Sequence, residues 1–369
     1  MDEQLLTERL IAFDTSNAEG VKQCSGFVRG WLEARDIVSH HLEVHGLPVT
    51  VADVGPEDAP ITLLLHGHLD VVPGRSEQFQ PRVEGDHLYG RGAYDMKGAL
   101  AAMLLAVADL RDGNGGVRVR LGIVPDEESE EELERGGDVL VQEGFVGDFA
   151  ITGEPTDMHV GVAAKGVVAM RLRVDGRAAH GATPWLGENA ILRAIDVFRA
   201  IQSLPFASRS SELFDRPSIN LGRILCGDAL NKVPDTCFID VDVRYLPEQD
   251  PEAIIEEVSG IPGATVVSTF RRAPAAVDPQ SPFVRALCKA TASHHEGEVM
   301  SVGRDGASDA VSFLRAGIPA VEFGSLGAGH HGPDEWVSID SLGNYRRAIV
   351  DFAQDLPQRL AAERDGGSA

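Results

Sequence analysis

Residues 63–73 read Leu63-Leu64-Leu65-His66-Gly67-His68-Leu69-Asp70-Val71-Val72-Pro73. The run from Ile61 to Leu65 contains no turn residue, which is typical of a strand covered on both faces of a sheet. Side chains alternate along an extended chain, so His68 and Asp70 are expected to point to the same side. An imidazole that binds a metal usually donates its other N–H to a carboxylate or carbonyl. The pair therefore fits a metal ligand with its orienting carboxylate, or a loop-end histidine whose hydrogen bonds are satisfied without a metal.

The length and composition indicate a two-domain globular protein. A chain of 369 residues is long for a single core. Its hydrophobic content of 43% and charged content of 24% are ordinary for a soluble protein. The longest apolar stretch, residues 99–110, is too short to cross a bilayer. The start, residues 1–4, lacks the pattern of a signal peptide, so we expect a cytoplasmic protein.

The charge argues against two classes of partner. The formal net charge is −24, which repels a phosphate backbone or an anionic membrane at long range. We therefore expect no nucleic acid and no membrane partner. The four cysteines, Cys24, Cys226, Cys237 and Cys288, form no C-x-x-C pair and are predicted to be buried thiols.

Hydrophobic periodicity predicts alternating helices and strands. Helical spacing is found at residues 2–13, 21–35, 99–110, 188–204, 251–258, 282–293 and 342–356. Strands are expected at 37–44, 48–54, 61–65, 117–124, 149–152, 167–174, 218–225, 237–245, 265–270 and 320–323. The acidic tract at 129–134 is interpreted as the solvated first turn of a helix that includes Val139 and Leu140.

The elements between residues 167 and 274 follow the order β-α-β-β-α-β, which is the ferredoxin-like or split βαβ unit. The α/β alternation around this unit resumes after it. The sequence therefore predicts one discontinuous domain at 1–166 and 275–369, with an inserted domain at 167–274.

Polar side chains follow three of the predicted central strands. His68 and Asp70 end the first, Glu127 and Glu128 follow the 117–124 strand, and Glu154 follows the 149–152 strand. In open α/β sheets, ligands collect beyond the carboxyl ends of the strands. These side chains are therefore expected to share one site.

Two further residues have alternative interpretations when each is taken alone. Asp95 precedes the 99–110 helix, where a carboxylate is a common N-cap. His331 lies in a glycine-rich loop after the 320–323 strand, which also fits an ordinary surface loop. Two imidazoles with several carboxylates suit zinc or cobalt better than calcium or magnesium. The absence of cysteine from this set argues against a closed structural zinc site.

Together these motifs resemble a known family. It comprises the co-catalytic zinc peptidases and deacylases, including succinyl-diaminopimelate desuccinylase, acetylornithine deacetylase, aminoacylase and glutamate carboxypeptidase. The resemblance covers nearly the whole chain. It rests on residues 67–73, Gly90-Arg91-Gly92, Asp95-Met96-Lys97-Gly98, Asp126-Glu127-Glu128, Gly153-Glu154-Pro155-Thr156, and His331 four residues before Glu335.

The resemblance implies a site for two divalent metal ions, zinc with cobalt as the alternative. His68 would bind one ion and His331 the other, with Asp95 bridging both. Glu128 would complete the shell of one ion and Glu154 that of the other.

The family also implies the catalytic roles. Asp70 would orient His68. Glu127 would be the general base that takes a proton from the metal-bridging water and passes it to the leaving amine. The family often has a cis peptide after the bridging aspartate, here Asp95–Met96.

The resemblance further implies a fold. It is an α/β protein with a mixed-sheet zinc-peptidase catalytic domain and an inserted ferredoxin-like lid and dimerisation domain. The segment from Ala179 to Pro184 matches the one whose histidine, here His180, stabilises the oxyanion in a neighbouring subunit. We therefore expect a homodimer formed through the lid. Substrate contacts are expected from Asn231, Arg244, Arg304, Gly306 and Ser308, while Ala307 departs from the usual Gly-Thr-Ser-Asp loop.

The leading hypothesis is a dinuclear amidohydrolase that removes an acyl group from an N-acyl amino acid, as in lysine and arginine biosynthesis. A dipeptidase or carboxypeptidase with the same machinery is the alternative among enzymes. A non-catalytic metal-binding homologue is the alternative of another class, but it predicts a missing ligand or base. Neither a P-loop nor a G-x-G-x-x-G after a strand is present, which argues against a nucleotide-handling enzyme.

Overall fold

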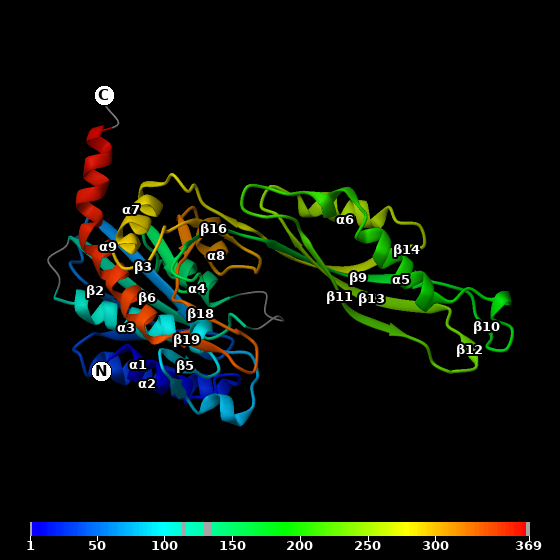
Figure 1. Ribbon diagram of the computed structural model, residues 1–369, viewed down its shortest axis with the longest axis horizontal. Coiled ribbons are helices and arrows are strands. Elements are labelled where there is room, and N and C mark those ends of the chain that lie inside the picture. Colours follow the sequence, from blue (N-terminus) through cyan, green and yellow to red (C-terminus); the bar gives the residue numbers. More distant parts are fainter. Residues whose placement is uncertain (1, 113–115, 129–134, 367–369) are drawn as a thin grey trace. The chain divides into compact units, whose positions relative to one another are not determined.

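The computed structural model describes residues 2–112, 116–128 and 135–366 (Figure 1). The chain forms two compact units. Unit 1 comprises Met1–Val162, Val277–Val302 and Asp309–Ala369, and unit 2 comprises Ala163–Ala276 and Gly303–Ser308. The acidic tract at 129–134, predicted to begin a helix, lies outside the described residues.

Unit 1 is built on a mixed sheet. Seven of its strands are β1 (Ser39–Val44), β2 (Leu47–Val54), β3 (Ile61–His68), β6 (Val117–Val124), β7 (Phe149–Thr152), β17 (Ala320–Glu322) and β8 (Val160–Ala164); the short strands β15 (Ala275–Ala276) and β16 (Ser301–Arg304) pair with β8. The seven strands are ordered β1-β2-β6-β3-β7-β17-β8. The central pairs β3–β6, β3–β7 and β7–β17 are parallel, and the outer pairs are antiparallel.

Helices cover both faces of this sheet. One face carries α3 (Gly98–Leu110), α7 (Pro282–Ala292) and α9 (Ile339–Gly366), and the other carries α4 (Gly136–Gln142) and α8 (Ala310–Arg315). Helix α1 (Glu3–Ile11) packs against α3 and α9, and α2 (Ala18–Glu33) packs against β1 and β2. On the first face the ring of Phe149 stacks on Phe283 at 5.0 Å. On the second, Leu140 and Phe313 pack against Leu64 and Val124.

The register of the parallel strands explains why polar residues gather at one edge. His68 at the end of β3 pairs with Val124 at the end of β6, and His66 pairs with Thr152 at the end of β7. Because these strands run in the same direction, the residues that follow them leave the sheet at the same edge. Glu127, Glu128 and Glu154 therefore leave the sheet beside His68.

A small antiparallel sheet in unit 1 was not predicted from the sequence. It consists of β18 (Gly327–Ala328), β19 (Trp336–Ser338), β5 (His87–Tyr89) and β4 (Arg82–Glu84). These strands are two or three residues long and have too few residues to show alternation. Pairing of Trp336 with Tyr89 places the loop that carries His331 beside the loop that carries Asp95.

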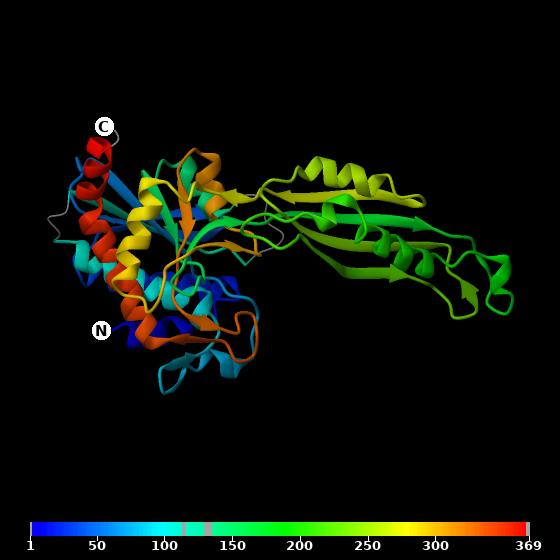
Figure 2. The same ribbon diagram turned by 45° about the horizontal axis from the view of Figure 1, so that its top comes forward.

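Unit 2 has the expected ferredoxin-like order. Its elements are β9 (Gly166–Asp175), α5 (Ala190–Ile201), β11 (Ser218–Cys226), β13 (Thr236–Tyr245), α6 (Pro251–Ser259) and β14 (Ala264–Arg272). The sheet order is β11-β13-β9-β14, antiparallel throughout. Figure 2 shows both helices on one face of the sheet, where the alternating apolar residues of β13 are buried against them. The predicted α/β class, with a mixed sheet and an inserted unit of this kind, is confirmed.

A short ribbon extends from unit 2. It pairs β10 (Ala179–His180) with β12 (Lys232–Val233), beyond the ends of β9 and β13 (Figure 1). Helix α5 is shorter than predicted. Helix α9 is longer, because strong helix formers such as Arg359 and Leu360 continue it past Pro357.

The remaining expectations concern the cysteines and the membrane. Cys24 and Cys237 are buried free thiols, whereas Cys226 and Cys288 are partly exposed, so the prediction of four buried thiols is wrong for two of them. Within the described ranges, no helix has both the length and the apolar character needed to cross a membrane.

Candidate metal centre

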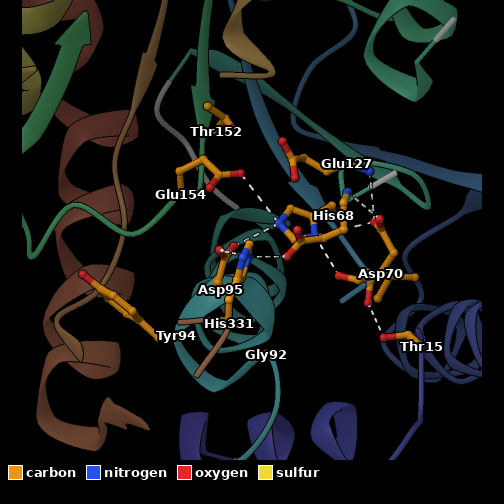
Figure 3. A network of polar contacts seen from close by, with 12 residues as sticks. Thr15, His68, Asp70, Gly92, Tyr94, Asp95, Glu127, Thr152, Glu154 and His331 are labelled. Carbon is orange, nitrogen blue, oxygen red and sulfur yellow. Dashed lines mark hydrogen bonds and ion pairs between the residues drawn. The ribbon is translucent and has the colours of Figure 1, made fainter. Parts of the chain in front are cut away.

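Two groups of potential metal ligands meet at the carboxyl edge of the unit 1 sheet. One consists of His68, Asp95 and Glu154, and the other of Asp95, Glu128 and His331. Within each group, the candidate ligand atoms lie within 4.8 Å of one another. All five residues were predicted as ligands, and Figure 3 shows His68, Asp95, Glu154 and His331 directed toward a common point. The structure thus brings together five residues spread over most of the chain.

Asp95 is common to both groups, and each of its oxygens faces a different imidazole. Its Oδ1 lies 3.2 Å from Nε2 of His68. Its Oδ2 lies 3.4 Å from Nε2 of His331. A carboxylate in this position can donate one oxygen to each of two ions. The two groups therefore form one candidate centre in which Asp95 is the shared residue.

The distances fit divalent ions bound between these side chains. Zinc binds histidine nitrogen and carboxylate oxygen at about 2.0–2.2 Å, which in a tetrahedral site separates two ligand atoms by roughly 3.4 Å. Besides Asp95, Nε2 of His68 has Oε1 of Glu154 at 3.7 Å, and Nε2 of His331 has Oε1 of Glu128 at 3.0 Å. The nitrogen and oxygen donors, with no sulfur, suit zinc or cobalt.

Asp70 contacts His68 through its backbone and not through the carboxylate that the sequence pattern suggested. Nδ1 of His68 lies 2.9 Å from the backbone oxygen of Asp70, while the nearest carboxylate oxygen is 3.6 Å away and outside hydrogen-bond range. The carboxylate instead accepts the backbone N–H groups of Glu127 at 3.2 Å and Glu128 at 2.7 Å. Asp70 therefore orients His68 through its main chain and the following acidic turn through its side chain.

Asp95 is not the N-cap of α3. The cap position belongs to Lys97, and Asp95 lies in a wide turn from Ala93 to Lys97 whose Asp95–Met96 peptide bond is cis, as the resemblance implied. The side chain of Met96 fills the space over two strand-end glycines. A Cβ at Gly67 would lie 2.6 Å from Met96 Cε, and one at Gly153 would lie 2.4 Å from it.

The pKa values of these side chains reflect burial and the close approach of carboxylates to imidazoles. Burial alone would raise the pKa of Asp95, but hydrogen bonds with His331 and His68 hold it well below its usual range. Hydrogen bonds to Asp95 and Glu128 raise the pKa of His331 to about 10. Burial and the neighbouring Asp95 raise the pKa of Glu154. A bound cation would replace these protons, because metal ligands must be deprotonated.

Glu127 belongs to neither ligand group. Burial, followed by the charge of Asp309, raises its pKa to about 8. Figure 3 shows its side chain beside His68. Its backbone is fixed by Asp70, as described above. The side chain is thus held next to the ligands without being one of them.

The other predicted site residues lie in unit 2 and form two groups. His180 and Asn231 lie in the short ribbon, where the N–H of Gly181 donates to the carbonyl of Asn231 at 2.7 Å. Arg244 lies near the opposite end of β13, eight residue steps from Thr236. At roughly 3.4 Å per residue, that is about 27 Å.

Arg304, Gly306 and Ser308 belong to the Arg244 group. The carbonyl of Arg304 accepts the N–H of Lys165, the neighbour of Gly166, which pairs with Tyr245 at that end of the sheet. Nε of Arg244 donates to Asp242 at 2.9 Å. The two predicted groups therefore lie at opposite ends of the unit 2 sheet.

Sequence reasoning gave no role to two residues that the structure places against the centre. Arg91 and Glu335 were quoted only as members of motifs. Glu335 accepts the backbone N–H groups of Tyr94 and Asp95, both at 3.0 Å. The Gly90-Arg91-Gly92 motif and the four-residue spacing from His331 to Glu335 are visible in the sequence, but the hydrogen bonds between the two segments are not.

Comparison with known proteins supports a single family. The model of peptidase family M20/M25/M40 matches residues 64–355. The succinyl-diaminopimelate desuccinylase of Erythrobacter litoralis is 29% identical over 306 residues, covering 78% of this chain and 79% of that protein. The enzyme of the same name from Stenotrophomonas maltophilia is 29% identical over 322 residues, covering 82% and 84%.

Solved structures share the fold at lower identity. A tripeptidase from Staphylococcus aureus has a TM-score of 0.80 at 19% identity and covers 97% of this chain and 99% of its own. A dinuclear metal-binding peptidase from Bacillus subtilis has a TM-score of 0.67 at 16% identity, covering 95% and 98%. The family model spans most of the chain and includes every predicted metal ligand. The chain therefore belongs to peptidase family M20/M25/M40 and is a metal-dependent hydrolase of amide or peptide bonds.

Proposed function

We propose that this protein is a dinuclear metalloenzyme that hydrolyses the amide bond of an N-acyl amino acid, in the manner of a succinyl-diaminopimelate desuccinylase. The proposal depends on the position of the Asp95 carboxylate, whose Oδ1 lies near Nε2 of His68 and whose Oδ2 lies near Nε2 of His331. The substrate class is supported by the names of the curated relatives, which match over most of both chains. Residues 1–166 and 275–369 would form the catalytic domain, and residues 167–274 the lid.

His68 and Glu154 would hold one ion, His331 and Glu128 the other, and Asp95 both. Zinc or cobalt bound by these residues would supply Lewis acidity, which lowers the pKa of a water molecule and polarises the substrate carbonyl. Glu127 would take the proton of that water and return it to the leaving amine, because it lies beside the ligands without being one. Burial raises its pKa to about 8, close to neutral pH, which suits a group that both takes and returns a proton.

His180 is suited to stabilise the developing oxyanion. Its Nδ1 accepts the N–H of Ala182 at 3.0 Å, so the neutral ring carries its proton on Nε2. The ring is exposed, and this N–H is a donor for an external oxygen. We infer that the oxygen belongs to a substrate in the partner subunit, because Arg244 and His180 lie too far apart on one sheet to hold the same small molecule.

A homodimer formed through the lid supplies the partner. Strand β11 lies at the edge of the unit 2 sheet. It exposes Ile224 and Leu225, and α5 exposes Leu192. An apolar edge strand favours association with another copy of the chain.

The polar end of the substrate would be held by Arg244, Arg304, Asn231, Gly306 and Ser308. A guanidinium grips a carboxylate with two parallel hydrogen bonds, and N-acyl amino acids carry such a carboxylate. Of these residues, Asn231 would act with His180 from the partner's ribbon.

The test is a substrate panel with the zinc- and the cobalt-loaded enzyme. N-succinyl and N-acetyl derivatives of diaminopimelate, ornithine and other amino acids are compared with dipeptides and tripeptides. The proposal is supported if an acyl-amino acid has a higher kcat/KM than every dipeptide and tripeptide in the panel. Hydrolysis of peptides alone would replace it with a dipeptidase or carboxypeptidase. Two bound ions without hydrolysis of any amide would favour the non-catalytic homologue.

A further inference from the structure

The carboxylate of Glu335 is buried in unit 1, with a side chain only 1% exposed, and it accepts four hydrogen bonds from one short segment. Oε1 accepts the backbone N–H groups of Tyr94 and Asp95, each at 3.0 Å. Oε2 accepts the N–H of Gly92 at 2.9 Å and Nη1 of Arg91 at 2.8 Å. Glu335 thus fixes the backbone on which the shared ligand Asp95 is mounted.

Arg91 connects the same carboxylate to the other loop. While Nη1 donates to Glu335, Nη2 donates to the backbone oxygen of His331 at 3.3 Å. His331 has a φ of 61°, in the left-handed region that a residue other than glycine rarely occupies. Such a conformation persists only where its surroundings fix it. The guanidinium of Arg91 is one of the groups that fix the backbone of His331.

The two halves of the centre have different supports. His68 ends a central strand and its ring is fixed by the main chain of Asp70, and Glu154 follows the neighbouring strand. His331 lies in a loop and its side chain is 50% exposed. Its link to the body of unit 1 includes Arg91 and Glu335. Loss of that link should therefore disturb the His331 half more than the His68 half.

We propose that Arg91 and Glu335 are positioning residues that hold the loops of Asp95 and His331 in register and thereby set the affinity of the second metal position. The inference rests on the proposed dinuclear centre. The charged hydrogen bond between Arg91 and Glu335 is of the stronger kind, and both side chains are buried. Outer residues that orient metal ligands change metal affinity by about 10- to 100-fold when they are replaced.

The experiment measures the two metal affinities of Glu335→Gln separately. Metal-free protein is titrated with cobalt and followed by its visible absorption, and the bound metal is counted after dialysis against buffered zinc. We expect the weaker affinity to fall by about 10- to 100-fold and the tighter one to change by less than about threefold. The metal content at limiting zinc would fall from two ions per chain toward one.

Two further variants and a control sharpen the test. Arg91→Lys keeps the charge but cannot donate to both partners from a planar fork, so it should move the weaker affinity in the same direction. Asp53→Asn breaks an ion pair with Arg118, 2.6 Å long, in the same unit and away from the centre. It should leave both affinities unchanged.

Glu335→Gln leaves the charge of Arg91 buried, which can prevent folding. The neutral double variant Arg91→Met/Glu335→Gln removes both charges, and circular dichroism establishes which variants fold. A folded variant with wild-type affinity at both positions overturns the inference. So does an equal loss at both positions, which indicates a general structural role. Failure of the wild type to bind a second ion would instead refute the proposed function.

Discussion

The carboxylate of Asp70 accepts the backbone N–H of Glu128 at 2.7 Å. Asp70 also contacts His68, so Asp70 supports two parts of the candidate centre. Its carbonyl fixes the ring of His68, and its side chain fixes the turn that presents Glu127 and Glu128. In Figure 3 these contacts lie on the side of His68 away from Glu154. Asp70 therefore couples His68, a proposed metal ligand, to Glu127, the proposed base.

The first prediction follows from this double contact. In Asp70→Asn the backbone carbonyl remains, but only one side-chain oxygen is left for two N–H donors. We expect His68 to keep its metal, while kcat falls by about 10- to 100-fold because the acidic turn shifts. Steady-state kinetics with metal analysis would check this. A loss of the His68 ion with the turn intact would show that the carboxylate acts mainly on the ring.

The second prediction concerns the base. Glu127→Gln preserves the shape of the side chain and removes its ability to take a proton. Removal of a general base costs about 10²- to 10⁴-fold in kcat. We expect a loss of this size with both ions retained, measured by kinetics and metal counting. An active Glu127→Gln enzyme would show that another group carries the proton.

The third prediction separates ligands from the base. His331→Ala should lose one ion and most activity, because the second group then has only two carboxylates. His68→Ala should disturb the other position. Isothermal titration with zinc would resolve the remaining site in each variant. Two intact zinc sites in His331→Ala would remove this residue from the ligand set.

The fourth prediction is a dependence of stability on pH in the metal-free protein. The pKa of His331 is raised from 6.5 to about 10, and that of Glu127 from 4.5 to about 8. Each group binds its proton more tightly in the folded chain than in the unfolded chain. The contribution of each group to the free energy of unfolding is fully present below its pKa in the unfolded chain. It is lost as the pH rises through its pKa in the folded chain. The metal-free protein should therefore be less stable at pH 9 than at pH 6.

Urea unfolding at the two pH values measures this effect. Zinc should restore more stability at pH 9 than at pH 6, because fewer protons must be displaced there. Calorimetry in buffers of different ionisation enthalpy should show protons released on zinc binding at pH 7. Equal stability of the metal-free protein at both pH values would contradict the assigned protonation.

Much of the centre was predictable because it follows strong local patterns. Buried apolar strands end at residues such as His68, and parallel pairing brings such ends together. Asp95 taken alone favours an N-cap, and only the set of motifs corrected that interpretation. The contacts of Asp70 and Glu335 could not be predicted, since they depend on tertiary pairing between segments. The small sheet that joins the Asp95 and His331 loops has strands too short for a periodic signal.

The fifth prediction asks whether His180 acts across subunits. His180→Ala should lower kcat and leave both metal affinities unchanged, since His180 lies in unit 2 and the ligands lie in unit 1. The decisive sample mixes His180→Ala with Glu127→Ala chains, each of which has low activity by itself. In a mixed dimer the His180→Ala chain has an intact base and can receive His180 from its partner.

Activity that rises on mixing and subunit exchange therefore indicates action in trans. If His180 acts within its own chain, every site in the mixed dimer lacks either the base or the oxyanion donor, and mixing does not raise the activity. A second mixture, Glu127→Ala with His331→Ala, is the matched control. Neither of its chains has both the base and the complete ligand set, so mixing should restore nothing. The roughly 27 Å between Thr236 and Arg244 along β13 is the physical reason to expect the trans result.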